Sequence, residues 1–304
     1  MRGIFDNGDW VIVIKTGKRY QVEIDYEDYT TRNKSSMKKY IVLSVNDNPD
    51  YLFHVPLTVW AWKYFGWEPI IFYNSETWNN PSDFEILVLG GMNVLPLSIQ
   101  GYQSDTITQV SRLYGSCIVD GYVMTGDIDM LPISDYWKPE MDKLTVYGRD
   151  LTDYHYPICY IGAPSVVWSE IMHLSHDDYN GYIKYDLDRL PQAKSNDKTN
   201  RWVTDQDLIT KRINDSKHVP TRIDRGTDNR TGYPIGRVDR SNWTLDHKEF
   251  VDCHMFHSIQ NDDAKFKKTI EMLHTVFPNE DFKWWINYVK EFRKLCNGNL
   301  KLAK

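Results

Sequence analysis

The sequence has 304 residues, a length within the range of one large α/β domain. Its 36 basic and 42 acidic residues give a net charge of −6, which argues against non-specific binding of nucleic acid. The four cysteines show no C-x-x-C spacing, which argues against a zinc knuckle or a disulfide framework. No apolar run approaches the roughly 20 residues that span a bilayer. The sequence therefore predicts a soluble, cytoplasmic protein with no transmembrane segment and no nucleic-acid partner.

The first third of the chain alternates between predicted strands and helices. Residues 10–26 read as a β-hairpin around a turn-prone centre. Short apolar runs over residues 40–45, 69–73 and 84–89 predict three strands, and helical spacing over 55–66 predicts a helix between the first two. This order is typical of a parallel sheet in an α/β fold.

The strongest local signal is Asp127-Ile-Asp129, which directly follows a predicted strand at 122–124. An amphipathic helix over residues 105–115 precedes that strand. Open α/β sheets bind their ligands at the carboxyl ends of strands, and carboxylates suit Mg²⁺ and Mn²⁺, which also bridge phosphate oxygens. Such a cation neutralises the charge that grows on a departing diphosphate. Taken alone, the pattern is also typical of a solvated turn with a capping Asp.

The remainder of the chain carries weaker patterns. Residues 177–240 are rich in Asp, Asn, Lys, Arg and Gly, and predict a loop-rich region with one helix that starts near Asp205. Helical spacing over 264–297 predicts two packed C-terminal helices that are interrupted at Pro278.

Residues 108–115 and 119–130 together resemble the stretch of GT-A glycosyltransferases in which a helix with an Arg precedes a strand and its Asp-x-Asp. The resemblance is to the retaining galactosyltransferase and glycogenin group and to soluble glycosyltransferases of bacteria and large DNA viruses. It implies a single α/β domain of the GT-A (Rossmann-like) type, with a mixed, mainly parallel central sheet over residues 40–304 and an N-terminal hairpin extension over 1–39. The parts that it implies within the domain are a nucleotide-binding part at about 40–135, an acceptor-binding part at about 136–260 and the C-terminal helices at 264–297.

The same resemblance assigns donor contacts to three residues around the Asp-x-Asp. Arg112 is expected to reach the diphosphate or the sugar of the donor, and Asp127 and Ile128 are expected to contact the nucleotide sugar. A guanidinium fork offers two parallel hydrogen bonds to phosphate or vicinal hydroxyl oxygens, which agrees with that role. The alternative is a surface Arg on an amphipathic helix.

A second match is Trp202-Val-Thr-Asp-Gln-Asp-Leu-Ile209, which looks like the Asp-Gln-Asp segment that these enzymes place beside the transferred sugar. The resemblance implies that Asp205 and Gln206 touch the donor sugar and that Asp207 starts or supports a helix. A carboxylate there can bind hydroxyls or stabilise an oxocarbenium-like centre. Acidic residues in the first turn of any helix are the alternative reading.

A third match is Phe250-Val-Asp-Cys-His-Met-Phe-His257, where related enzymes supply a His as a further metal ligand. A neutral imidazole is a good Mn²⁺ ligand. Both His254 and His257 are candidates, with His254 preferred. The sequence departs from the galactosyltransferase group here, because it lacks the Gly and the Lys-Pro-Trp that follow the His in that group.

Two further segments are candidates for donor contacts. Ser44, Asn46 and Asp47 follow the first strand of the sheet, where GT-A enzymes hold the nucleoside, although turn chemistry explains these residues equally well. Gly162 and Ala163 lie in a segment that resembles the one that contacts the transferred sugar.

The Arg-rich residues 222–243, which include Arg237 and Arg240, fit a lid over the diphosphate, an acceptor-binding loop or a solvated loop.

The order of these matches predicts an Mn²⁺- or Mg²⁺-dependent glycosyltransferase that moves a hexose or pentose from a nucleotide sugar, most simply a UDP-sugar, to a glycan or sugar acceptor. Two other classes stay open. A sugar nucleotidyltransferase also uses an α/β sheet and acidic metal ligands, but usually carries a Gly-rich phosphate loop, which is not evident here. A non-catalytic carbohydrate-binding protein explains the aromatic residues but not the ordered acids.

Overall fold

The protein is described by a computed structural model that covers residues 37–75, 83–148, 155–175, 177–223, 226–227, 234–241, 243–245 and 250–302. The chain divides into two units, Met1–Met37 and Lys38–Lys304. The hairpin predicted at residues 10–26 lies outside the described residues. The second unit contains every element discussed below, and no helix among its described residues is long and apolar enough to cross a membrane.

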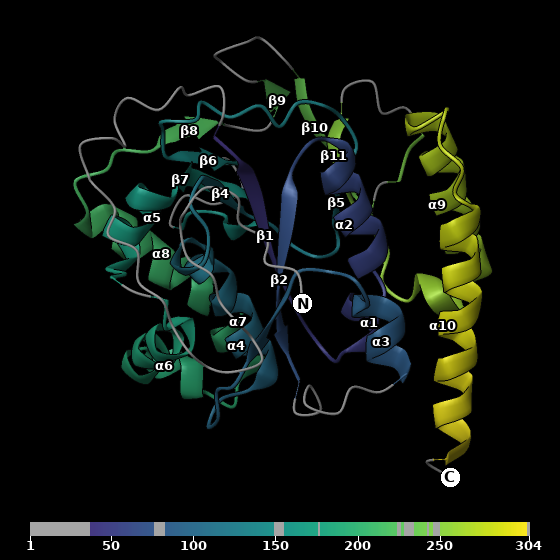
Figure 1. Cartoon of the computed structure of the whole chain (residues 1–304), viewed down its shortest axis with the longest axis horizontal. Helices are drawn as coiled ribbons and strands as arrows, with labels where there is room; N and C mark the ends of the chain where they lie inside the picture. Colours follow the sequence, from purple (N-terminus) through teal and green to yellow (C-terminus); the bar gives the residue numbers. More distant parts are fainter. Residues whose placement is uncertain are drawn as a thin grey trace. The chain divides into compact units, whose positions relative to one another are not determined.

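Seven described strands form the central sheet in the order β3-β2-β1-β4-β7-β6-β8 (Figure 1). The strands are β1 (Lys39–Asn46), β2 (Glu68–Asn74), β3 (Val94–Leu97), β4 (Tyr122–Thr125), β6 (Thr145–Tyr147), β7 (Ile161–Pro164) and β8 (Thr221–Ile223). Strands β3, β2, β1 and β4 are parallel, as are β6 and β8, whereas β7 is antiparallel to both β4 and β6. The mixed, mainly parallel α/β sheet predicted from the sequence is therefore confirmed.

Helices cover both faces of this sheet. They are α1 (Pro49–Leu52), α2 (Val55–Tyr64), α3 (Asp83–Leu89), α4 (Ser104–Ser111), α5 (Ser165–Met172), α6 (Tyr179–Arg189), α7 (Lys198–Trp202), α8 (Thr204–Asp215), α9 (Asp263–Val276) and α10 (Lys283–Leu302). In Figure 1, α4 to α8 lie on one side of β1 and β2, and α2, α3, α9 and α10 lie on the other. Six consecutive residues of β1 are buried, as expected for a parallel strand that is covered on both faces. The two predicted C-terminal helices are confirmed as α9 and α10.

A second, smaller sheet was not expected from the sequence. Its strands run in the order β5-β11-β10-β9, and they are β5 (Met130–Pro132), β11 (Phe250–His254), β10 (Pro234–Val238) and β9 (Gly226–Thr227). Strand β5 pairs antiparallel with β11, and β10 pairs parallel with β11. Because β5 begins at the residue after Asp129, this sheet brings the distant β11 against the Asp-x-Asp segment.

Two predictions of local structure were wrong. Residues 84–89 form helix α3 and not a strand, and the third strand of the parallel sheet is β3. A short, mostly apolar segment such as residues 84–89 fits a buried helix as well as a strand, so periodicity does not separate them. Residues 177–240 contain α6 and α7 besides the expected helix α8. In α6 the buried Ile183 and Leu187 lie one turn apart, but a Gly and three acidic or amide residues obscure the pattern.

Gly162 of β7, predicted as a donor contact, packs tightly against β4. A Cβ atom at this position would lie 2.6 Å from the Tyr122 hydroxyl oxygen and under 3 Å from two ring carbons. The neighbouring Ala163 is fully buried in the same strand. The fold alone therefore requires a glycine at position 162.

We expect Gly162→Ala to lower the free energy of unfolding by about 1–3 kcal/mol, because the Tyr122 ring and strand β7 must move apart. Urea unfolding measures the cost. In a Tyr122→Leu background the same substitution should cost less, because the ring that the methyl group meets is gone. An equal cost in both backgrounds would contradict this explanation.

Candidate functional site

The acidic turn (residues 127–129) begins two residues after β4, between the ends of β1 and β7. The amide of Gly126 donates to the carbonyl of Val42 in β1, at 2.9 Å. The carbonyl of Asp127 accepts from the Met130 amide at 3.1 Å, which closes the turn. The two predicted carboxylates therefore stand at the carboxyl end of the parallel strands, where the sequence placed them.

The other two carbonyls of the acidic turn are held by distant elements. The Thr58 hydroxyl of α2 donates to the carbonyl of Ile128 at 2.7 Å, in a buried position. The Met255 amide, just after β11, donates to the carbonyl of Asp129 at 2.9 Å. All three carbonyls of the turn thus have partners, which lie at the start of β5, in α2 and just after β11.

Arg112 joins two of the predicted acidic residues in what we call the guanidinium cluster (Arg112, Asp127 and Asp205). It lies just after α4 in a 3₁₀ helix, Arg112–Cys117, and its side chain is only 7% exposed. One terminal nitrogen pairs with the Asp127 carboxylate, and Nη2 lies 2.7 Å from Oδ2 of Asp205, which is 1% exposed. Burial would lower the pKa of Arg112, but the two carboxylates hold it above its ordinary value. The guanidinium is therefore a permanent charge that binds two carboxylates, one of them 93 positions away in the sequence.

Asp129 faces two imidazoles in what we call the imidazole cluster (Asp129, His254 and His257). Its Oδ2 lies 3.3 Å from Nε2 of His254 and 3.5 Å from Nε2 of His257. Burial would raise the pKa of Asp129, but the two imidazoles hold it well below its usual range. Burial would lower the pKa of His254, but the Asp129 carboxylate raises it. The carboxylate is thus kept as an anion between two nitrogen donors.

Two separations between donor atoms of the imidazole cluster are close to those around a divalent cation. Two donors that share one ion at bond lengths of about 2.1 Å lie ~3.0–3.4 Å apart, close to the separations found here. Nε2 of His257 is buried and makes no hydrogen bond with any described residue. Within the described part of the chain, no group of three or more His, Cys, Asp and Glu side chains is placed so that it could hold a metal ion, so a cation here requires these side chains to move. Asp127 in particular is turned toward Arg112 and away from this cluster.

Three other predicted residues lie at the ends of β1 and on the loop after it. Ser44 is buried, Asn46 is half-buried and Asp47 is exposed. The amide nitrogen of the Asn46 side chain donates to the Ser104 hydroxyl at 3.1 Å, and its carbonyl oxygen accepts from the Asn48 amide. These contacts are turn and helix-end chemistry, and a role in nucleoside binding stays a prediction.

The Asp-Gln-Asp segment lies in the first turn of α8. Asp205 forms its ion pair with Arg112, and the Gln206 side chain is half-buried. Asp207 accepts from the Gln192 side chain at 3.0 Å, and its other oxygen lies 2.6 Å from Nε2 of His155. Contact of these residues with a donor sugar stays a prediction.

Sequence reasoning missed several residues that shape the site. Thr58 and Asp239 gave no signal, because a lone Thr on a helix and a lone Asp in a polar loop are common. Oδ2 of Asp239 lies 3.1 Å from Nδ1 of His254, within hydrogen-bonding distance. The sequence left three roles open for the loop that contains Arg240. In the structure, Nη1 of Arg240 lies 3.3 Å from Oδ2 of Asp129. Asp239 and Arg240 become recognisable only when the small sheet brings the end of β10 to the acidic turn, and Thr58 only when α2 packs against that turn.

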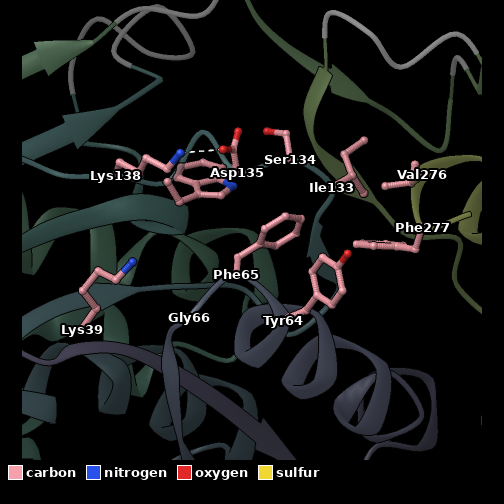
Figure 2. A pocket seen from close by; sticks show the side chains of 11 residues that line it. Lys39, Tyr64, Phe65, Gly66, Ile133, Ser134, Asp135, Lys138, Val276 and Phe277 are labelled. Carbon is pink, nitrogen blue, oxygen red and sulfur yellow. Dashed lines mark hydrogen bonds and ion pairs between the residues drawn. The ribbon is translucent and has the colours of Figure 1, made fainter. Parts of the chain in front are cut away.

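A pocket of about 740 Å³ lies elsewhere in the second unit (Figure 2). Its lining comes from the start of β1, the end of α2, the segment after β5 and the end of α9. Figure 2 shows aromatic rings of Tyr64, Phe65 and Phe277 around it and an ion pair between Lys138 and Asp135 at its rim. None of the predicted site residues lines this pocket, so it is distinct from the acidic turn.

Comparisons of the sequence with protein-family models and with curated proteins found no match. Among solved structures, glycosyltransferase GlyE of Streptococcus pneumoniae TIGR4 is similar, with 9% identity over 86% of this chain and a TM-score of 0.44. This chain spans 64% of the GlyE chain. An active-site mutant of LgtC has 13% identity over 76% of this chain and 94% of its own, with a TM-score of 0.41.

The galactosyltransferase LgtC, in complex with donor and acceptor sugar analogs, has 10% identity over 82% of this chain and 99% of its own, with a TM-score of 0.41. These neighbours are glycosyltransferases. Similarity at this level does not carry their reaction over to this chain, whose function depends on the residues described above.

Thr58→Val is expected to destabilise the protein by about 1–2 kcal/mol, because it leaves the buried carbonyl of Ile128 without a donor. Urea unfolding measures the change. Thr269→Val in α9 is the matched control, since its hydroxyl bonds the carbonyl of Lys265, four residues earlier in the same helix. A Thr58 variant as stable as the control variant would contradict the role assigned to this bond.

His54, at the start of α2, generates a prediction on pH. Burial lowers its pKa to about 4, and its Nε2 makes no hydrogen bond with a described residue. The unfolded chain takes up the proton near pH 6.5, whereas the folded protein does not, so stability falls as the pH drops from about 6.5 to 4. At pH 5 this loss is about 2 kcal/mol for one group with these two pKa values.

Unfolding free energies of the wild type and of His54→Gln at pH 7.5 and pH 5 test this. The wild type should lose about 2 kcal/mol more than the variant between these two values. The same substitution at the exposed His274 is the control for the loss of a histidine elsewhere in the chain. Parallel curves for the wild type and His54→Gln would show that another group causes the acid instability.

Proposed function

We propose that this chain is a metal-dependent glycosyltransferase that moves a sugar from a nucleotide sugar, a UDP-sugar, to a glycan or sugar acceptor. One observation carries the proposal: the acidic turn joins the guanidinium cluster and the imidazole cluster at the carboxyl end of β4. Four segments that are far apart in the sequence supply charged groups suited to a nucleotide diphosphate and a sugar. A solvated turn explains neither the burial of Arg112 and Asp205 nor the convergence of two imidazoles on Asp129.

Asp129, His254 and His257 would hold the cation, Mn²⁺ or Mg²⁺, through one carboxylate oxygen and two imidazole nitrogens. When bound, the cation supplies Lewis-acid stabilisation of the charge that develops on the leaving diphosphate. Asp127, 31% exposed, is the second candidate ligand, and it reaches the cation only by exchanging its pairing with Arg112. The nucleotide would lie over residues 40–135, with Asn46 and Asp47 beside the nucleoside.

The sugar would lie near the start of α8, with the acceptor bound by residues 136–260. Asp205 is buried and paired with Arg112, so it acts by orienting that guanidinium and the donor sugar. Asp207 is 33% exposed and lies beside His155. If the reaction inverts the anomeric centre, Asp207 is therefore better placed than Asp205 to take the proton of an acceptor hydroxyl. A retaining reaction needs no such base.

Calorimetric titration with a panel of UDP- and GDP-sugars, with and without Mn²⁺, tests the proposal. We expect one nucleotide class to bind in an Mn²⁺-dependent manner. The double variant Asp127→Asn/Asp129→Asn should weaken that binding by more than about tenfold, since even outer partners of metal ligands are worth about 10–100-fold. The matched control is Asp135→Asn/Asp215→Asn, which removes two exposed carboxylates that pair with neighbouring lysines.

Two results would overturn the proposal. Sugar binding that ignores both Mn²⁺ and the nucleotide would indicate a carbohydrate-binding protein. Formation of a nucleotide sugar from a sugar phosphate and a nucleoside triphosphate would indicate a nucleotidyltransferase.

A further inference from the structure

Asp239 and Arg240 follow β10 directly and reach the two sides of the imidazole cluster. Oδ2 of Asp239 lies 3.1 Å from Nδ1 of His254. Nη1 of Arg240 lies 3.3 Å from Oδ2 of Asp129 and 3.5 Å from the carbonyl of Met255. Two adjacent side chains of opposite charge thus contact a candidate metal ligand each.

Asp239 determines which nitrogen of His254 is available to a cation. A carboxylate accepts a hydrogen bond, so Nδ1 keeps its proton toward Asp239, and Nε2, which faces Asp129, is the nitrogen whose lone pair a cation would take. The carboxylate is itself fixed, because its Oδ1 accepts from the amide of Ser241 at 2.8 Å and from its hydroxyl at 2.5 Å. A His with this partner is both oriented and made a stronger ligand.

Arg240 acts on the same cluster in the opposite sense. Its guanidinium contacts Oδ2 of Asp129, the oxygen toward which both imidazole nitrogens converge. A cation held by that oxygen would bring two positive groups together, so Arg240 must leave as the cation arrives. The side chain is 32% exposed and sits in a short turn, which leaves it room to move toward an anionic ligand.

We propose that Asp239 and Arg240 control cation binding at Asp129 in opposite directions: Asp239 fixes His254 as a ligand, and Arg240 competes with the cation until a diphosphate draws it away. This inference rests on the proposed function, because it needs a cation at the imidazole cluster and a diphosphate beside it. Arg240 is a positioning residue for the free protein and a diphosphate contact in the complex. Cation and nucleotide therefore bind with positive coupling, since each removes an obstacle to the other.

The experiment measures Mn²⁺ binding without nucleotide, from the electron paramagnetic resonance signal of free Mn²⁺, and then UDP binding in saturating Mn²⁺ by calorimetry. Asp239→Asn keeps the shape but removes the charge, and should weaken Mn²⁺ binding by about 10–100-fold. Arg240→Gln should tighten Mn²⁺ binding roughly fivefold, the worth of a half-exposed ion pair. The same variant should weaken UDP binding about tenfold, because a charge-assisted contact is lost.

Two further variants separate this control from general damage. Arg240→Lys keeps the positive charge and should bind Mn²⁺ almost as the wild type does. Helix α6 carries a second adjacent Asp–Arg pair, so Asp188→Asn and Arg189→Gln are matched controls that should change neither binding constant. A loss of folding would weaken the binding of both Mn²⁺ and UDP in every variant. The proposal instead requires Asp239→Asn to weaken Mn²⁺ binding and Arg240→Gln to tighten it.

The outcomes distinguish the two proposals. If the wild type binds Mn²⁺ and UDP but the Asp239 and Arg240 variants shift Mn²⁺ binding in the same direction or not at all, the control by these residues is wrong and the proposed function stands. If the wild type binds no Mn²⁺ even in the presence of UDP, both proposals fail together.

Discussion

A buried guanidinium between two carboxylates is the interaction on which the site depends. Arg112 is 7% exposed and Asp205 is 1% exposed, so neither charge is hydrated and each requires the other. Asp127, at the surface side of the pair, takes the second terminal nitrogen. The pairing thereby fixes the start of α8 against the end of β4, and it fixes one end of the acidic turn before any ligand arrives.

The other end of the turn depends on the small sheet. Strand β5 begins directly after Asp129, and its pairing with β11 brings His254 and His257 to that carboxylate. Along an extended strand two acids at positions i and i+2 would share one face, and the turn that the Asp127 carbonyl and the Met130 amide close lets them serve different partners. Asp127 turns toward Arg112, just after α4, and Asp129 turns toward the small sheet.

The sequence predicted the parallel half of the fold well, because buried parallel strands such as β1 are continuous apolar runs. It did not predict the small sheet, whose strands are two to five residues long and take their order from long-range pairing. Among site residues, acids at a strand end and His in a strand were recognisable by type and order. Thr58 and Asp239 were not, because a hydroxyl or a carboxylate gains its role only from the distant atom that it meets.

The two clusters also differ in how easily they can rearrange. The guanidinium cluster is buried and paired on both sides, so moving Arg112 would leave a buried charge without a partner, at a cost of several kcal/mol. Arg240 and Asp239 are half-exposed, and solvent can replace their contacts at far lower cost. The guanidinium cluster is therefore the rigid side of the site, and Asp239 and Arg240 form the side that can rearrange around a ligand. A ligand can shift the structure only where a second arrangement is accessible and binds the ligand more tightly. The residues that control ligand binding are therefore those on the β10–β11 side of the acidic turn, and Arg112 is not one of them.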